Sequence, residues 1–91
     1  MFIMPKSIPR SIVEQGRILK YDIFEDSHIA VSILQLEPCS KVKKHSHQGN
    51  EKVIHFNLLT KSLTVCPVGS EHELENSSKT DSLIILSVKI K

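Results

Sequence analysis

The sequence predicts an all-β domain, a sandwich or barrel of short antiparallel strands. Short runs that alternate apolar and polar side chains are separated by turn residues, and this spacing is typical of β-hairpins. No segment carries a helical period with caps at its ends. The chain has 91 residues, of which 40% are hydrophobic and 24% are charged. This size and composition indicate one small soluble globular domain rather than a disordered segment.

Six strands are expected, over residues 17–24, 28–36, 51–59, 62–65, 71–76 and 83–90. In the first, Leu19, Tyr21 and Ile23 alternate with Lys20 and Asp22, so the two groups lie on opposite faces. The second is apolar on both faces in places, and the last is strongly apolar. Strands inside a sandwich or barrel have this composition.

The strand expected over residues 71–76 shows the cleanest alternation. Glu71, Glu73 and Glu75 fall on one face and mark the solvent side. His72 and Leu74 fall on the other face, so the imidazole of His72 is expected to point inward.

The segments ahead of and between these strands are expected to be irregular. Residues 1–16 form an N-terminal arm ahead of a barrel domain of residues 17–91, because Pro5 and Pro9 oppose a helix and Gly16 closes the segment. Such an arm is either loose or adds a strand to a neighbour. The basic run 41–44 favours a solvated loop over a dedicated anion site.

Composition excludes several classes of function. The formal net charge is +2, with one Tyr and no Trp, so neither a basic surface nor a base-stacking platform for nucleic acid is expected. No run approaches the ~20 apolar residues of a membrane-spanning helix, and no signal peptide is evident. We therefore expect a cytoplasmic protein without a membrane partner. Cys39 and Cys66 are expected to be reduced thiols.

Three side chains that bind metals lie within seven residues, at His45, His47 and Glu51. Two histidines two residues apart share one face of a strand. The Gln-Gly-Asn insert that follows can turn the chain and bring the carboxylate round to the imidazoles. Borderline divalent metals favour this mixture of ligands, so the stretch predicts most of a metal site, lacking one ligand.

His72 is the candidate for the missing ligand, because it is inward and follows the turn residues Pro67 and Gly69. With it, two segments of the sequence resemble the two motifs of the cupin superfamily. The matching residues of the first motif are His45, His47 and Glu51, and those of the second are Pro67, Gly69, His72 and Asn76. Upstream, Leu36 and Pro38 are similar to the Leu-x-Pro-Gly entry of the family, with Cys39 in place of the glycine.

The resemblance implies a small antiparallel jelly-roll barrel of the RmlC-like type. It also implies that His45, His47, Glu51 and His72 bind one divalent ion, either Fe, Mn, Ni, Cu or Zn. Two further motif glycines are replaced, by Leu58 and Lys61, and the spacing between the motifs is short. These departures predict a shortened hairpin between the motifs and an incomplete wall of the barrel. Unpaired sheet edges in so short a chain predict a homodimer.

Three other residues carry weaker expectations. His55 is expected to line the pocket, to hold a metal ligand in place, or to be an ordinary buried histidine. Cys66 could face the cavity, but a packed thiol is favoured over a nucleophile because no base is placed beside it by sequence. Asn76 is expected to fix a loop.

Fold and metal do not determine the reaction, so three functions stay open. The first is a metal-dependent enzyme of oxygenase or isomerase type acting on a small molecule. The second is a sensor or binder of a metal or small molecule without turnover. The third is a dimeric scaffold with a vestigial site. No catalytic residue beyond the metal ligands is assigned.

Overall fold

The computed structural model describes residues 4–46, 52–67, 69 and 71–91, with only the backbone described for residues 45 and 46. These residues form nine strands in two antiparallel sheets. The strands are β1 (Lys6–Ser7), β2 (Val13–Gln15), β3 (Ile18–Glu25), β4 (Ile29–Leu36), β5 (Lys41–Ser46), β6 (Lys52–Asn57), β7 (Ser62–Cys66), β8 (Glu71–Glu75) and β9 (Leu83–Ile90). Within this part of the chain, no helix is long and apolar enough to cross a membrane.

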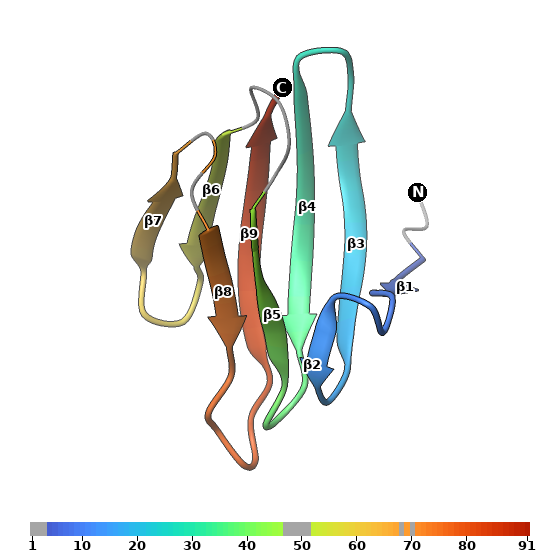
Figure 1. Cartoon of the computed structure of the whole chain (residues 1–91), viewed down its shortest axis with the longest axis vertical. Helices are drawn as coiled ribbons and strands as arrows, with labels where there is room; N and C mark the ends of the chain where they lie inside the picture. Colours follow the sequence, from blue (N-terminus) through green and yellow to red (C-terminus); the bar gives the residue numbers. More distant parts are fainter. Residues whose placement is uncertain (1–3, 47–51, 68, 70) are drawn as a thin grey trace.

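Six strands form the larger sheet, in the order β1-β3-β4-β9-β6-β7, and three form the smaller, in the order β2-β5-β8. Figure 1 shows β8, β5 and β2 in front of the larger sheet. β4 pairs with β9 over the full length of both strands, from Ile29 opposite Ile90 to Leu36 opposite Leu83. The fold is therefore an all-β jelly-roll barrel with two unequal walls.

The hydrophobic core lies at the end of the barrel where β3 begins and β4 ends. Ile18 and Leu36 are fully buried there, and Val42 and Ile85 pack against them. Ile18 pairs with Leu36 in register, while Val42 comes from the smaller sheet. Apolar residues from both sheets thus close one end of the barrel.

The six expected strands are confirmed to within two residues at each end. The prediction of a loop at residues 41–44 was wrong, because these residues begin β5. Val42 is buried on the inner face. Nearby lysines make surface ion pairs, Lys41 with Glu14 at 3.3 Å and Lys44 with Glu71 at 3.7 Å. Because Lys43 and Lys44 are exposed, the buried Val42 marks the inner face of this part of the strand.

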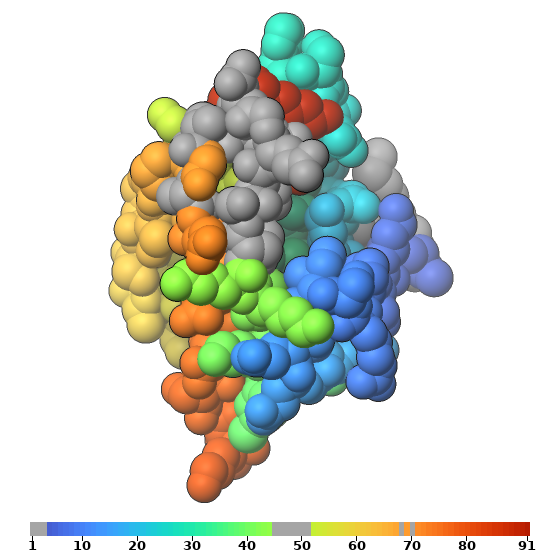
Figure 2. All heavy atoms as spheres, in the orientation of Figure 1, coloured from blue at the N-terminus to red at the C-terminus, as the bar shows by residue number. Residues whose placement is uncertain are grey.

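The N-terminal arm adds one short strand to each sheet. β1 pairs with β3, and β2 pairs with β5 through Val13 opposite Val42. Figure 2 shows the blue arm lying against the green β5 strand. Of the two alternatives left open by the sequence, the structure shows strand addition, within this chain itself.

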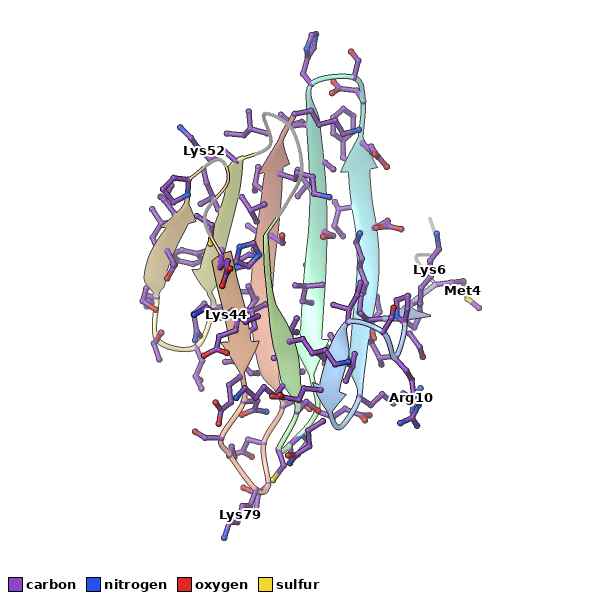
Figure 3. The ribbon with its side chains drawn as sticks, in the orientation of Figure 1. Met4, Lys6, Arg10, Lys44, Lys52 and Lys79 are labelled. Carbon is purple, nitrogen blue, oxygen red and sulfur yellow. The ribbon has the colours of Figure 1, made fainter. Side chains whose placement is uncertain are left out.

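Asn76 fixes the loop that leads from β8 to β9, as the sequence predicts. Its buried amide donates hydrogen bonds to the carbonyl oxygens of Leu36 at 3.0 Å, Glu37 at 3.2 Å and Asp81 at 2.8 Å. Its Oδ1 accepts a hydrogen bond from the backbone N–H of Ser78 at 3.1 Å. One side chain therefore joins the ends of β4, β8 and β9. Lys79, at the tip of this loop, is labelled in Figure 3.

A tight hairpin joins β6 to β7, with Asn57 opposite Ser62. The Oδ1 atom of Asn57 accepts hydrogen bonds from the N–H groups of Leu59 and Thr60, which is the pattern of an Asx turn. Lys61 closes the turn with a φ of 59°. The hairpin between the two cupin-like motifs is thus short, in agreement with the spacing of the motifs.

Candidate functional site

A cavity of about 250 Å³ lies between the two sheets, above the apolar core. Its apolar floor includes Ile18, Leu34, Val42 and Leu74, so both sheets contribute to it. The remaining lining mixes polar residues with apolar ones such as Phe24 and Val53. Some of the polar residues come from β4 and β9, although the sequence gives these strands a strongly apolar composition. The cavity therefore has the mixed lining of a small-molecule site.

A band of four polar residues crosses the cavity wall at one level, and we call it the polar band. Pairing in register places Asp22 opposite Ser32, Ser32 opposite Ser87, and Ser87 opposite His55. All four residues line the cavity. Four neighbouring strands of the larger sheet, β3, β4, β9 and β6, thus present hydrogen-bonding groups side by side. Polar groups aligned in this way can orient a ligand with several oxygens.

His72 faces this band from the smaller sheet. It lines the cavity, its Nδ1 atom is buried, and the glutamates on either side of it are exposed. The inward orientation predicted for His72 is therefore confirmed. The ring of His55 meets the ring of His72 edge to face, with centroids 5.7 Å apart and planes at 81°.

His55 is itself buried, with 7% of its surface exposed. It lines the cavity, which is one of the alternatives considered for it. The edge-to-face contact also restricts the rotation of the His72 ring, because aromatic rings prefer this geometry to a parallel stack. His55 therefore contributes both to the wall of the cavity and to the orientation of the expected metal ligand.

The backbone places one further expected ligand beside His72. His45 lies directly opposite His72 in the pairing of β5 with β8. Residues opposite each other in an antiparallel pair have Cβ atoms about 4.5–5.5 Å apart, which is close enough for two imidazoles to bind one ion. This register fits the expected ligand set.

The other two expected ligands, His47 and Glu51, lie outside the described residues. In the part of the chain that is described, no three metal-binding side chains come together. The four-residue metal site therefore stays a prediction, supported by the position of His72 and the register of His45.

Cys66 is buried at the end of β7, opposite Val53. Val53 lines the cavity, whereas Cys66 is not among the lining residues. Burial raises the pKa of the Cys66 thiol, which keeps it protonated at neutral pH. These observations favour the packed thiol over a nucleophile.

Two lysines lie beside Asp22, the β3 member of the polar band. Lys20 lines the cavity, and its Nζ lies 3.6 Å from Oδ1 of Asp22. Lys6, from the N-terminal arm, lies 3.3 Å from Oδ2 of the same carboxylate. The face of β3 that carries lysine and aspartate therefore points inward, and the face that carries Leu19, Tyr21 and Ile23 points outward.

Asp22, Ser32 and Ser87 were not assigned to the site from the sequence. Each of the two serines interrupts a largely apolar strand, and this interruption was the sequence feature that could have indicated a polar site. It becomes informative only when the register is known, because the pairing brings Ser32 and Ser87 together across β4 and β9.

Solved structures of cupin type share this fold. A structure from Thermotoga maritima described as a predicted oxalate decarboxylase has 20% identity and a TM-score of 0.69, with coverage of 97% of this chain and 92% of that chain. KdgF from Halomonas sp. has 14% identity and a TM-score of 0.71, with coverage of 100% and 94%. An RmlC-like cupin protein from Desulfovibrio desulfuricans has 13% identity and a TM-score of 0.52, with coverage of 80% and 81%.

No family model matches the sequence, and no curated protein matches it at a significant level. At identities of 13–20% the likeness establishes the fold alone.

Proposed function

Because the chain has the cupin fold, we propose that it is a metal-dependent protein that acts on a small polar molecule held between its two sheets. The observation that carries the proposal is the polar band facing His72 across a cavity with an apolar floor. Buried Ser32, half-buried Ser87 and buried His55 lie among largely apolar residues of β4, β9 and β6. Hydroxyl and imidazole groups that line a cavity can form hydrogen bonds with a polar ligand held there.

The residues that would hold the metal ion are His45, His47, Glu51 and His72. A bound divalent ion would supply Lewis-acid polarisation of a substrate oxygen or activation of dioxygen. The register of His45 opposite His72 and the imidazole-rich donor set support this assignment. Sequence and register do not select one metal, because cellular supply decides as much as ligand type.

The protein's own side chains would bind and orient the substrate. Ser32 and Ser87 can each donate and accept a hydrogen bond, so they can hold a hydroxyl or carboxylate oxygen at the level of His72. The apolar floor excludes water below them and strengthens these hydrogen bonds. His55 would keep the ring of His72 in one orientation through its edge-to-face contact. Within this proposal the reaction is of oxygenase or isomerase type.

One observation favours the second candidate, a binder or sensor without turnover. Thr64 lies opposite His55 in register but is exposed, so the smaller sheet does not cover β7 at this level. An open wall beside the site admits water, and water competes with the chemistry of reactive intermediates. Binding alone tolerates such an opening.

A ligand screen separates the candidates. Metal-loaded protein is mixed with a panel of small hydroxy acids and dicarboxylic acids, and binding is followed by calorimetry and turnover by mass spectrometry. We expect at least one member to bind to the wild type and to lose binding in Ser87→Leu, which fills the cavity at the polar band. Ser77→Leu, on the exposed loop, is the matched control and should bind normally.

Conversion of the bound compound by the wild type supports the enzyme, and binding without conversion supports the sensor. Equal binding by Ser87→Leu and the wild type would contradict the assignment of the cavity as the site.

A further inference from the structure

The N-terminal arm closes the seam between the two sheets on one side of the cavity. β1 is an edge strand of the larger sheet, and β2 is an edge strand of the smaller sheet. The chain crosses from one sheet to the other at residues 8–12, between these two strands. Ile8 and Ile12, at the two ends of the crossing, both line the cavity. The arm therefore forms the wall of the cavity at this seam.

Short ladders and little burial hold the arm in this position. β1 has two residues and β2 has three. Between residues 4 and 15, every residue is exposed except Ile8 and Val13, which are half-buried. A segment with few paired residues and little buried surface opens locally at a lower free energy than the rest of the fold.

An ion pair ties the arm to the polar band. Nζ of Lys6 lies 3.3 Å from Oδ2 of Asp22, and the two side chains are 74% and 50% exposed. Figure 3 labels Lys6 on the arm, beside β3. Exposed ion pairs of this kind contribute little to stability, so water can replace the contact at small cost. Detachment of the arm would separate Lys6 from Asp22 and uncover this end of the cavity.

The arm meets the rest of the fold at Gly16. This residue has a φ of 77°, and a Cβ atom there would lie 2.8 Å from Cα of Ser40. Oγ of the fully buried Ser40 accepts a hydrogen bond from the N–H of Arg17 and donates one to its carbonyl oxygen, both at 2.9 Å. Arg17 is thereby fixed to the fold, whereas the glycine before it can change its backbone angles at little steric cost. Gly16 is therefore the natural hinge of the arm.

We propose that the N-terminal arm is a lid that opens about Gly16 and admits small molecules to the cavity. Ile8 and Val13 pack against the hydrophobic core, so the closed position is the more stable one and the lid returns to it. Opening separates β1 from β3 and β2 from β5, and the other strands stay paired. The lid rests on the proposed function in taking the cavity as the ligand site, but its tests use no ligand, so the two can fail separately.

The other candidate entrance is the side of the cavity next to β7, where Thr64 is exposed. A molecule that enters there passes no part of the arm. Restraining the arm therefore distinguishes the two routes.

Hydrogen exchange of the wild-type protein, followed by NMR, tests whether the arm opens by itself. The N–H of Ile8 donates to the carbonyl oxygen of Ile18 at 3.0 Å, and that of Lys43 donates to the carbonyl oxygen of Ile12 at 2.8 Å. We expect both to exchange at least about 100-fold faster than the slowest amides of β4, at a rate that low urea does not change, because local opening exposes little surface. Exchange at the rate and urea dependence of β4 would overturn the proposal, since the arm would then open only when the whole molecule unfolds.

A disulfide across β1 and β3 tests whether the opening admits molecules to the cavity. Ser7 lies opposite Leu19, so Ser7→Cys with Leu19→Cys can form a disulfide that keeps the arm closed. Ser32→Cys, buried in the polar band, is the reporter, in a Cys39→Ser background. The disulfide is formed first, the protein is then treated with iodoacetamide, and alkylation of the reporter is followed by peptide mass spectrometry. We expect alkylation to be at least about 10-fold slower than in the reporter protein without the disulfide.

The matched control is a disulfide that leaves the arm free. Tyr21→Cys with Ile33→Cys joins β3 to β4, where the two residues are opposite each other. It should not slow the alkylation of the reporter. Equal alkylation rates with and without the disulfide on the arm would overturn the proposal and assign entry to the side next to β7.

Discussion

Asn76 shows how one buried amide joins three strands. Its Nδ2 donates to three carbonyl oxygens, so Asn76→Asp would place a carboxylate against the same oxygens. We expect a loss of about 3–5 kcal/mol in the free energy of unfolding, because donors are lost and negative charge faces carbonyl dipoles. Denaturation by urea at neutral pH measures this loss.

The control for Asn76 is Ser77→Ala, since Ser77 is the exposed neighbour and its substitution should have little effect. A variant Asn76→Asp as stable as the wild type would show that the amide does not hold the loop.

Cys66 gives the stability of the protein a pH dependence of known sign. Burial raises the pKa of its thiol above the ordinary value of 9.0. A raised pKa in the folded state contributes stability that is fully present below the pKa of the unfolded state. That contribution is lost as the pH rises through the folded value. The free energy of unfolding should therefore fall above about pH 9.

Substitution isolates this contribution. Cys66→Val should remove the part of the alkaline slope that comes from the thiol, whereas Cys39→Ser, at the exposed cysteine, should retain it. Alkylation should likewise modify Cys39 first and Cys66 only on unfolding. Identical alkaline slopes for the wild type and Cys66→Val would argue against a buried, neutral thiol.

At the scale of elements, two turns keep a left-handed backbone without glycine. Cys39 has a φ of 61° and Lys61 a φ of 59°, and both stand where the cupin motifs have glycine. A residue with a Cβ atom costs about 1–2 kcal/mol in the left-handed conformation. Replacement by glycine removes this strain, but glycine also raises the conformational entropy of the unfolded chain, and this offsets part of the gain in stability. We therefore expect Lys61→Gly and Cys39→Gly each to stabilise the protein by about 0.5–1 kcal/mol.

Leu59→Gly is the matched control in the same hairpin, because Leu59 does not have a positive φ. It should be neutral or destabilising. If thermal or urea denaturation shows Lys61→Gly to be no more stable than Leu59→Gly, the strain assigned to the hairpin is absent.

The strands were predictable because their alternation is visible without tertiary information. The long strands β3, β4 and β9 each have eight residues, so their pattern stands out against chance. The arm strands β1 and β2 have two and three residues, which is too few for any period. β5 was missed because three of its first four residues are lysines, and among these four residues only Val42 is buried.

The residues of the candidate site were likewise predictable only where a local sequence pattern placed them. His72 could be placed inside the barrel from the glutamates that flank it, and this is confirmed. The polar band could not be predicted, because Ser32 and Ser87 are 55 positions apart in sequence and only the register of β4 with β9 joins them. The contact of His55 with His72 likewise connects different sheets. The position of His72 could be predicted because it follows from local alternation. The positions of Ser32 and Ser87 could not be predicted because they follow from strand pairing.

At the scale of the whole molecule, each face of the larger sheet has its own chemistry. The inward residues of the larger sheet include the polar band and line the cavity, whereas outward residues such as Ile33, Leu86 and Phe56 are apolar. A sheet that is buried on one side only would have a polar outer face. The outward residues of β4, β9 and β6 are instead apolar and half-buried in the single chain.

The smaller sheet has three strands against six, and β7 is exposed on its inner side at Thr64. Whether the cavity supports turnover or only binding depends on how well this wall excludes water.

The measurement that tests the central claim most directly is elemental analysis of protein purified without added metal. We expect about one divalent ion per chain in the wild type, held by His72 and its partners. His72→Ala should lower metal affinity at least 10–100-fold, roughly the loss that weaker perturbations of such sites already cause. His28→Ala, at an exposed histidine in the β3–β4 turn, should keep the metal. A wild type without bound metal, or an unchanged metal content in His72→Ala, would contradict the account.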